Sequence, residues 1–255
     1  MPDPSPRVGV IVPAAGAGRR LGRSNVKALV GLAEQPLLAW ALAAVEANRC
    51  VDSVVVVAHP LTIDAVRALV AARGFAKVAA VVPGGPTRRA SVAAGLAALP
   101  AGPSYVAVHD ACRPLLAAGA VDRLLEALRG MEGRYGVAPG APVTDTVRRV
   151  AAADCSAGIV DRDELRSIQT PQLYLRWVLE DAHRRAATGD GAGEADDAVL
   201  VERAGYAVTV VPGEPENLKV TTPVDLLAAE ALLERAGRAG QATRAGQATP
   251  GGAPR

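Results

Sequence analysis

Glycines and basic side chains are concentrated in one segment, PAAGAGRRLGRSNVK at residues 13–27, which directly follows an apolar run. Gly16 and Gly18 would let backbone amides approach phosphate oxygens, while Arg20 and Lys27 supply the positive charge that a triphosphate requires. Ligands of open α/β sheets bind beyond the carboxyl ends of the strands, where this segment would lie. The spacing predicts a nucleoside-triphosphate-binding loop.

Other phosphate-binding motifs fit this segment poorly. In a dinucleotide-binding G-x-G-x-x-G motif the third glycine would precede Gly22 by one residue, and the second expected strand ends in Ala58 and His59, without a ribose-binding acid. A Walker loop would need Gly-Lys followed by Ser or Thr after the glycines. The remaining alternative is a tight turn with solvated arginines, which the preceding strand and the added cations disfavour.

A second glycine turn occurs in PGGPTRRASVAAGL, residues 83–96. Its amides, including that of Gly85, and the Ser91 hydroxyl could hydrogen-bond the edge of a base. Ser91 could equally help to order the start of a helix, so this segment alone is uninformative.

The segment VHDACRP at residues 108–114 would place Asp110 and Arg113 on the same side of the sheet as the first loop. A carboxylate beside a triphosphate suits Mg²⁺, which prefers a few protein oxygens together with phosphates and water. A salt bridge between Asp110 and Arg113 is the alternative. We expect His109 to pack inside the strand end and not to act as a base.

Strands and helices alternate along the part of the chain that carries these segments. Short β-branched runs predict buried strands at 8–12, 53–58, 77–82 and 105–108, and Ala- and Leu-rich stretches predict helices at 37–47, 63–72, 90–99 and 120–128. This order predicts an α/β fold with a mostly parallel sheet and helices on both faces.

The pattern changes after Val137, where weak helical periodicity and several β-branched residues predict an extended β-arm or hairpin at about 139–164. Beyond it we expect helices at 175–187 and 197–203, a strand at 206–211, and a last helix from Pro223 to about Arg235.

Length and composition favour one principal domain over residues 1–237, because half of the 255 residues are hydrophobic. Residues 238–255 repeat RAGQAT and end in PGGAPR, a composition that predicts a disordered low-complexity tail. The net charge of +2 includes three arginines of this tail and no tail acid, so residues 1–237 carry +2 − 3 = −1. Arginines scattered among acids do not favour a nucleic-acid partner.

Cysteine usage and hydropathy bear on the compartment. Cys50, Cys112 and Cys155 are far apart and odd in number, which indicates neither a disulfide framework nor a close-spaced zinc site. The N-terminal residues MPDPSPR lack an apolar signal core, and no apolar run reaches about eighteen residues. We expect a cytoplasmic protein without a membrane partner.

Six segments together resemble the family of 2-C-methyl-D-erythritol 4-phosphate cytidylyltransferases of the non-mevalonate isoprenoid pathway. They are PAAGAGRRL with Lys27, GGPTRRASV, HDACRP, VTDTVRR, VDRDELRSIQTPQ and NLKVTTPVDL, and the resemblance covers about residues 8–234. It implies a Rossmann-like nucleotidyltransferase fold that binds CTP with Mg²⁺ and forms a homodimer by exchanging its arm.

The resemblance also implies site residues. The CTP site would be lined by Ala14, Ala15, Gly16, Gly18, Gly85, Ser91 and Asp110, with Mg²⁺ held mainly by the CTP phosphates and by Asp110. Catalytic cations would be Arg20, Lys27, Arg162 and Lys219. The polyol phosphate would be bound by Arg113, Thr144, Arg162, Thr170 and Lys219, with Thr144 and Arg162 donated by the partner's arm.

Three residues depart from the pattern of relatives. Val26 replaces a proline before the catalytic lysine, Pro86 replaces an acidic residue near the base, and Ala195 replaces a threonine near the polyol. Two other functions stay open: a cytidylyltransferase for another polyol phosphate such as ribitol 5-phosphate, and a non-catalytic CTP-binding protein.

Overall fold

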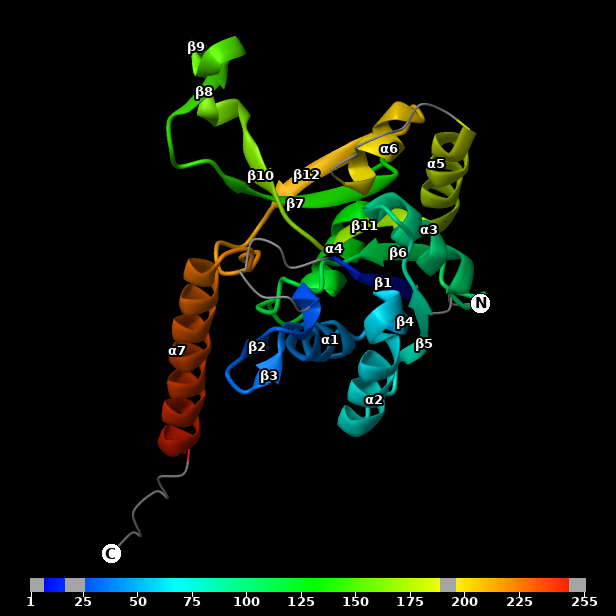
Figure 1. Ribbon diagram of the computed structural model, residues 1–255, viewed down its shortest axis with the longest axis vertical. Coiled ribbons are helices and arrows are strands. Elements are labelled where there is room, and N and C mark those ends of the chain that lie inside the picture. The colour runs from blue at the N-terminus through cyan, green and yellow to red at the C-terminus, as the bar shows by residue number, and fades with distance from the viewer. Residues whose placement is uncertain (1–6, 17–25, 189–195, 248–255) are drawn as a thin grey trace, which may run out of the picture.

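The computed structural model describes residues 7–16, 26–188 and 196–247, with the backbone alone described at 153, 188 and 238–247. Its centre is an eight-stranded sheet in the order β10-β7-β11-β6-β1-β4-β5, with β12 paired to β7 (Figure 1). The strands that pair in parallel around the centre are β1 (Val8–Ala14), β4 (Val51–Ala58), β5 (Val78–Pro83) and β6 (Tyr105–Val108). The predicted mostly parallel α/β sheet is confirmed.

The other half of the sheet is mixed. β11 (Gln172–Leu175) runs antiparallel to both β6 and β7 (Gly136–Pro142), β10 (Arg166–Ile168) is antiparallel to β7, and β12 (Val208–Pro212) is parallel to it. No strand is expected from the sequence at β10 or β11. Both are short, and their extended conformation depends on pairing with distant strands.

Helices cover both faces of the sheet, as predicted. Val10 and Val12 of β1 pack on the face covered by α1 (Leu37–Glu46), α2 (Ile63–Arg73) and α4 (Ala120–Arg129). Ile11 packs on the opposite face with α3 (Arg88–Ala98), α5 (Arg176–Thr188) and α6 (Asp197–Arg203). Burial on both sides explains why β1 is a continuous apolar run.

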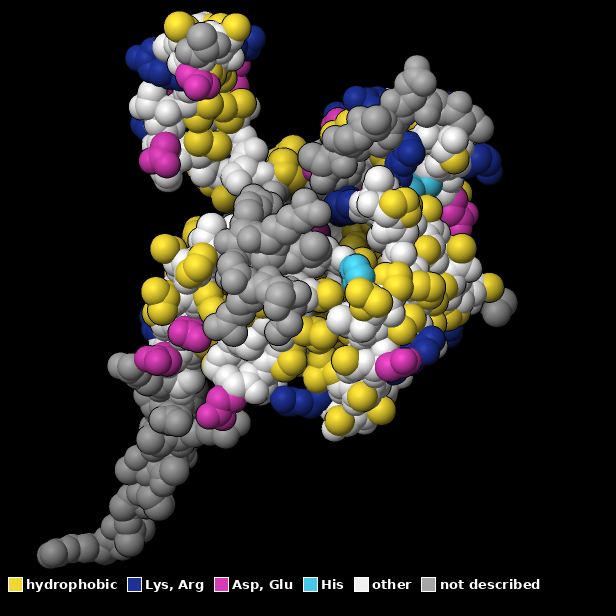
Figure 2. All heavy atoms as spheres, in the orientation of Figure 1, with side chains coloured by type: hydrophobic (Ala, Val, Ile, Leu, Met, Phe, Trp, Pro, Cys, Tyr) yellow, Lys and Arg dark blue, Asp and Glu magenta, His cyan; other side chains and the backbone are white. Residues whose placement is uncertain are grey.

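The predicted arm is a hairpin. β8 (Val147–Val150) and β9 (Ser156–Val160) pair antiparallel and project from the body beyond β7 and β10 (Figure 1). Val150 and Ile159 are 62% and 69% exposed, and Figure 2 shows hydrophobic and charged side chains together on this projection.

Short elements complete the fold: η2 (Lys27–Leu29), the β2–β3 hairpin (Gly31–Leu32 and Gln35–Pro36), η3 (Pro60–Thr62), η4 (Ala152–Asp154) and η5 (Arg162–Glu164). The last helix, α7 (Pro223–Gln247), continues past the expected end near Arg235 and includes residues 238–247, where we expect disorder. Arginine, alanine and glutamine of the RAGQAT repeat favour helix, while its glycine and threonine oppose it. No helix of the described residues combines the length and the apolarity needed to cross a membrane.

Candidate active site

The glycine loop starts where β1 ends. Ala14 is the last residue of β1, and the carbonyl of Gly16 accepts a hydrogen bond of 3.2 Å from the backbone amide of Lys27. This bond returns the chain to the carboxyl end of β1, so Lys27 starts η2 beside the strand that precedes the loop. Gly18 and Arg20 lie outside the described residues.

The second glycine turn packs directly on this loop. A side chain at Gly84 would place its Cβ 2.7 Å from Cβ of Ala15, which is closer than such atoms approach, and 3.0 Å from Oγ of Ser91, which is a tight contact. The amide of Gly85 donates to Ser91 Oγ over 3.2 Å, and the Ser91 hydroxyl donates to the carbonyl of Thr87 over 3.0 Å. Ser91 is buried and orders the turn before α3, which is the alternative left open above.

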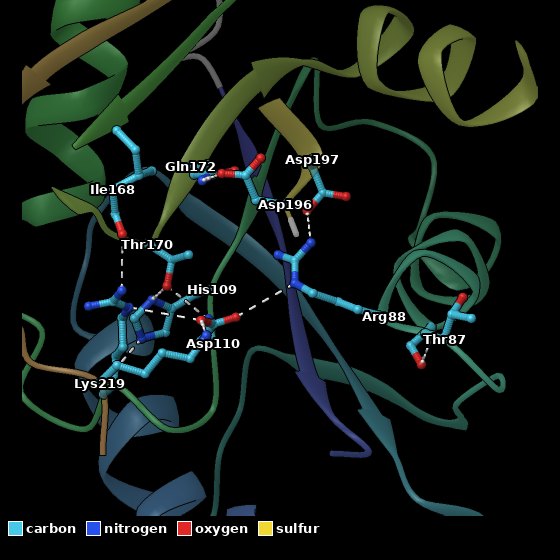
Figure 3. Close-up of polar contacts among 12 residues, drawn as sticks. Thr87, Arg88, His109, Asp110, Ile168, Thr170, Gln172, Asp196, Asp197 and Lys219 are labelled. Atoms are coloured by element: carbon cyan, nitrogen blue, oxygen red, sulfur yellow. Dashed lines mark hydrogen bonds and ion pairs between the residues drawn. The ribbon is translucent and has the colours of Figure 1, made fainter. Parts of the chain in front are cut away.

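Asp110, which is buried, is the centre of a group of charges at the end of β6. Its Oδ2 lies 2.7 Å from Nζ of Lys219 and 3.9 Å from Nε of Arg113, and its Oδ1 lies 3.9 Å from Nε of Arg88. Figure 3 shows Lys219 and Arg88 approaching Asp110 from opposite sides. Burial would raise the pKa of Asp110, but Lys219, Arg88 and Arg113 outweigh it and hold the pKa below its ordinary value.

His109 is fully buried, as predicted, and it fixes the hydroxyl of Thr170. Burial lowers the pKa of His109 to about 4, so the ring is neutral at pH 7. Its Nε2 lies 3.2 Å from the carbonyl oxygen of Arg113, which can only accept, and its Nδ1 lies 3.2 Å from Oγ1 of Thr170. The Thr170 hydroxyl therefore donates to Nδ1, and it accepts the amide of Asp110 over 3.0 Å.

Arg113 is held by backbone carbonyls. Its Nη1 donates to the carbonyl of Asn217 over 2.7 Å and its Nη2 to that of Ile168 over 3.2 Å, and only 8% of the residue is exposed. Asn217 also donates from Nδ2 to the carbonyl of Thr170 over 2.8 Å. Arg113 and Thr170 thus lie beside Asp110, and their polar groups contact atoms of the protein.

Lys27 and Cys112 connect the glycine loop to this group. Burial and the charge of Asp110 raise the pKa of the Cys112 thiol, while the nearby ammonium groups of Lys27 and Lys219 oppose that rise. Lys27, Lys219 and Asp110 therefore all lie in the surroundings of one buried thiol.

The arm residues lie apart from this group. Arg162 donates from Nη1 to the carbonyl of Thr144 over 2.6 Å, and both residues are exposed. Within the described residues no hydrogen bond or ion pair joins either of them to Asp110, Arg113, Thr170 or Lys219, and the arm projects from the body (Figure 1).

Three charged or titratable residues of this region are absent from the predicted site. Arg88 lies 2.7 Å from Oδ2 of Asp197, and His183 Nε2 lies 3.0 Å from Oδ1 of the same carboxylate. Arg88 stands inside the TRRAS part of the second glycine segment, so its basic charge beside the glycines is a signal that the sequence offers. His183 and Asp197 carry no local pattern that distinguishes them from surface residues of a helix.

The charges suit a polyanionic ligand that reacts without a protein base. Arg88, Arg113 and Lys219 surround the carboxylate of Asp110, Lys27 lies near the neighbouring thiol of Cys112, and the buried ring of His109 resists protonation. The described residues contain no cluster of three or more His, Cys, Asp or Glu side chains that could hold a metal alone. One carboxylate fits Mg²⁺ that is carried mainly by ligand phosphates.

A protein-family model and two known relatives match most of this chain. The family model for 2-C-methyl-D-erythritol 4-phosphate cytidylyltransferase (IspD) matches residues 8–235. The chain is 43% identical to the protein of that name from Streptomyces coelicolor over 237 residues, which are 90% of this chain and 86% of the relative. It is 37% identical over 224 residues to that of Synechocystis, covering 88% of this chain and 96% of the relative.

A solved structure agrees in fold as well as in sequence. The crystal structure of 2-C-methyl-D-erythritol 4-phosphate cytidylyltransferase from Thermus thermophilus superposes with a TM-score of 0.70 at 36% identity. The match covers 89% of this chain and 98% of that structure.

Proposed function

The chain belongs to the 2-C-methyl-D-erythritol 4-phosphate cytidylyltransferase family, and from this premise we propose how its residues carry out the reaction of that family. The protein transfers a cytidylyl group from CTP to 2-C-methyl-D-erythritol 4-phosphate, which gives 4-diphosphocytidyl-2-C-methyl-D-erythritol and pyrophosphate in the non-mevalonate isoprenoid pathway. The observation that supports this assignment best is the convergence of cations on Asp110 beside the glycine loop.

The nucleophile needs no general base. A phosphate monoester has a second pKa near about 6, so at neutral pH it is largely a dianion. One of its oxygens forms a bond to the α-phosphorus of CTP as the bond to pyrophosphate breaks, and no proton has to leave the nucleophile. The neutral, enclosed His109 is compatible with this chemistry because no base is required.

Cations carry the catalysis because the barrier is the approach of two polyanions and the charge that develops on the leaving pyrophosphate. Electrostatic preorganisation supplies most of the rate enhancement in such transfers. We assign this role to Lys27 and Arg20 on the CTP side and to Lys219 on the side of the polyol phosphate. The side chain of Lys219 is 43% exposed, so its ammonium can reach a bound phosphate while Asp110 orients it.

Nucleotide binding falls to the two glycine segments. Ala14, Ala15, Gly16 and Gly18 would present amides to the phosphates, and the turn of Gly85 and Ser91 would face the base. Bound Mg²⁺ would neutralise phosphate charge, with Asp110 as its protein ligand.

A homodimer is part of the proposal. Thr144 and Arg162 do not reach Asp110 within one chain, and the arm exposes Val150 and Ile159. The arm of a second copy would bring Thr144 and Arg162 to the polyol phosphate. Arg113 and Thr170 would contribute to the same binding site from the other chain. Free thiols at Cys50, Cys112 and Cys155 suit a cytoplasmic location.

The test is pyrophosphate release from CTP and Mg²⁺ with each polyol phosphate in turn. We expect release with the methylerythritol ester. Pyrophosphate release with ribitol 5-phosphate and not with the methylerythritol ester would show that ribitol 5-phosphate is the substrate. CTP binding without pyrophosphate release with any ester would indicate a non-catalytic nucleotide-binding protein.

A further inference from the structure

Arg88 lies between two carboxylates that come from different elements. Its Nη1 is 2.7 Å from Oδ2 of Asp197 at the start of α6, and its Nε is 3.9 Å from Oδ1 of Asp110 at the end of β6 (Figure 3). Arg88 itself begins α3, directly after the second glycine turn. One side chain therefore connects the turn assigned to the base, the central carboxylate and α6.

Asp197 is held in its charged form although it is fully buried. Burial would raise its pKa, but the hydrogen bond from His183 and the charge of Arg88 outweigh burial and lower it. Desolvating such a pair is costly, and apolar residues in its place are often equally stable, so stability is a weak reason for this ion pair. Its position beside Asp110 suggests a role in the reaction.

The two carboxylates compete for the same guanidinium. Coulomb attraction rises as distance falls, and Arg88 sits closer to Asp197 than to Asp110. Without the charge of Asp197, Arg88 would close on Oδ1 of Asp110. Asp110 would then form close ion pairs with both Arg88 and Lys219, and its ion pair with Lys219 would weaken.

We propose that Asp197 is a positioning residue for the cytidylyl transfer: by holding Arg88 it keeps Asp110 available to orient Lys219. The inference rests on the proposed function, because it concerns the residues assigned to that reaction. Asp197 does not touch the substrates in this scheme and acts only through Arg88.

Asp197→Asn is the informative variant because it preserves size and removes one negative charge. The site becomes more positive, so the KM for CTP stays the same or falls. The kcat falls on the order of 10-fold or more, because Lys219 is displaced from its productive position. A mere packing defect would instead raise the KM for CTP as well as lower kcat, and that combined result would overturn the proposal; a lower Tm is expected in either case, because the variant removes one partner of a buried ion pair.

A double variant isolates the route through Arg88. Arg88→Met lowers kcat as well, but adding Asp197→Asn to it causes no further loss, because the residue through which Asp197 acts is gone. The double variant also leaves no unpaired charge between these two positions, which protects its folding. Losses that multiply in the double variant would show that Asp197 acts independently of Arg88.

Asp181→Asn is the matched control. This carboxylate on α5 pairs with Arg185 over 2.7 Å and accepts from the hydroxyl of Tyr206 over 2.9 Å, so its loss should leave kcat unchanged. If the wild-type protein releases no pyrophosphate with any polyol phosphate, the proposed function itself fails. If the wild type is active and folded Asp197→Asn keeps kcat within about twofold of it, only the present inference fails.

Discussion

Nζ of Lys219 lies 2.7 Å from Oδ2 of Asp110, although the two residues are far apart in the chain. Asp110→Asn should therefore weaken both the fold and the reaction, because three cations lose their shared counter-charge. We expect a loss of about 1–3 kcal/mol in the free energy of unfolding at pH 7. Because the pKa of Asp110 is depressed in the folded protein, this contribution is present above about pH 4 and is lost as pH falls through the folded pKa. Urea unfolding at pH 7 and pH 3 measures it, and an equal difference between variant and wild type at both values would contradict the assignment.

Lys27→Ala should lower turnover on the order of 10²-fold or more, since it removes a cation assigned to the charge that develops on CTP. Pyrophosphate release under saturating substrates measures the change. Lys77→Ala is the control, because Lys77 precedes β5 at the opposite end of the strand from the glycine turn, donates to the carbonyl of Asn48 over 2.7 Å and has no assigned role. Wild-type turnover in purified Lys27→Ala protein would remove Lys27 from the mechanism.

His109 predicts a particular pH dependence of stability. Its pKa is lowered to about 4 in the folded protein, against about 6.5 when unfolded, so the unfolded state takes up the proton first as pH falls. The free energy of unfolding should drop by about 2 kcal/mol from this residue between pH 7 and pH 5. In urea unfolding, the His109→Gln variant should lose this dependence of the free energy of unfolding on pH. If the variant keeps the same dependence, a residue other than His109 is responsible for it.

Gly84→Ala tests the contact between the two glycine segments. The added Cβ would meet Ala15 at 2.7 Å and force the segments apart, so the KM for CTP should rise and stability should fall by about 1–3 kcal/mol. At Gly31 an added Cβ meets nothing within 4 Å, so Gly31→Ala serves as the control. An unchanged KM in the Gly84 variant would mean that CTP does not depend on this contact.

Mixing two inactive variants tests the exchanged arm. A Lys27→Ala chain and an Arg162→Ala chain should each be inactive, but their mixed dimer contains one site with an intact Lys27 and an intact Arg162. After random reassociation of equal amounts, roughly a quarter of wild-type activity should return. No recovery, with mixed dimers confirmed by mass spectrometry, would mean that the arm serves its own chain.

Regular elements can be predicted from the sequence where one local pattern decides the structure. The apolar run of β1 and the helix period of α4 depend on neighbours in the chain, and both lie within two residues of the expected bounds. β11 cannot be predicted in this way, because its four residues become a strand only by pairing with β6 and β7. The extension of α7 beyond Arg235 departs from the expectation of disorder, because a repeat that cannot form a core can still contain residues that favour helix, here Arg, Ala and Gln.

The site divides in the same way. Asp110 and the glycine loop follow strands whose carboxyl ends are predictable, so their placement at one edge of the sheet can be inferred from topology. The pairing of Arg88 with Asp197 joins residues separated by 109 positions, and nothing in either segment points to the other. The hydrogen bonds of the Thr170 hydroxyl are equally hidden in the sequence, because they depend on which ring nitrogen of His109 carries the proton.

The anchoring of Arg113 has a consequence for natural variation. Its two hydrogen-bond partners are the main-chain oxygens of Ile168 and Asn217, and every amino acid at those positions supplies the same oxygen. Point mutations there can change packing but cannot delete the acceptors. An insertion or deletion that shifts the backbone is the kind of genetic change that would release this arginine.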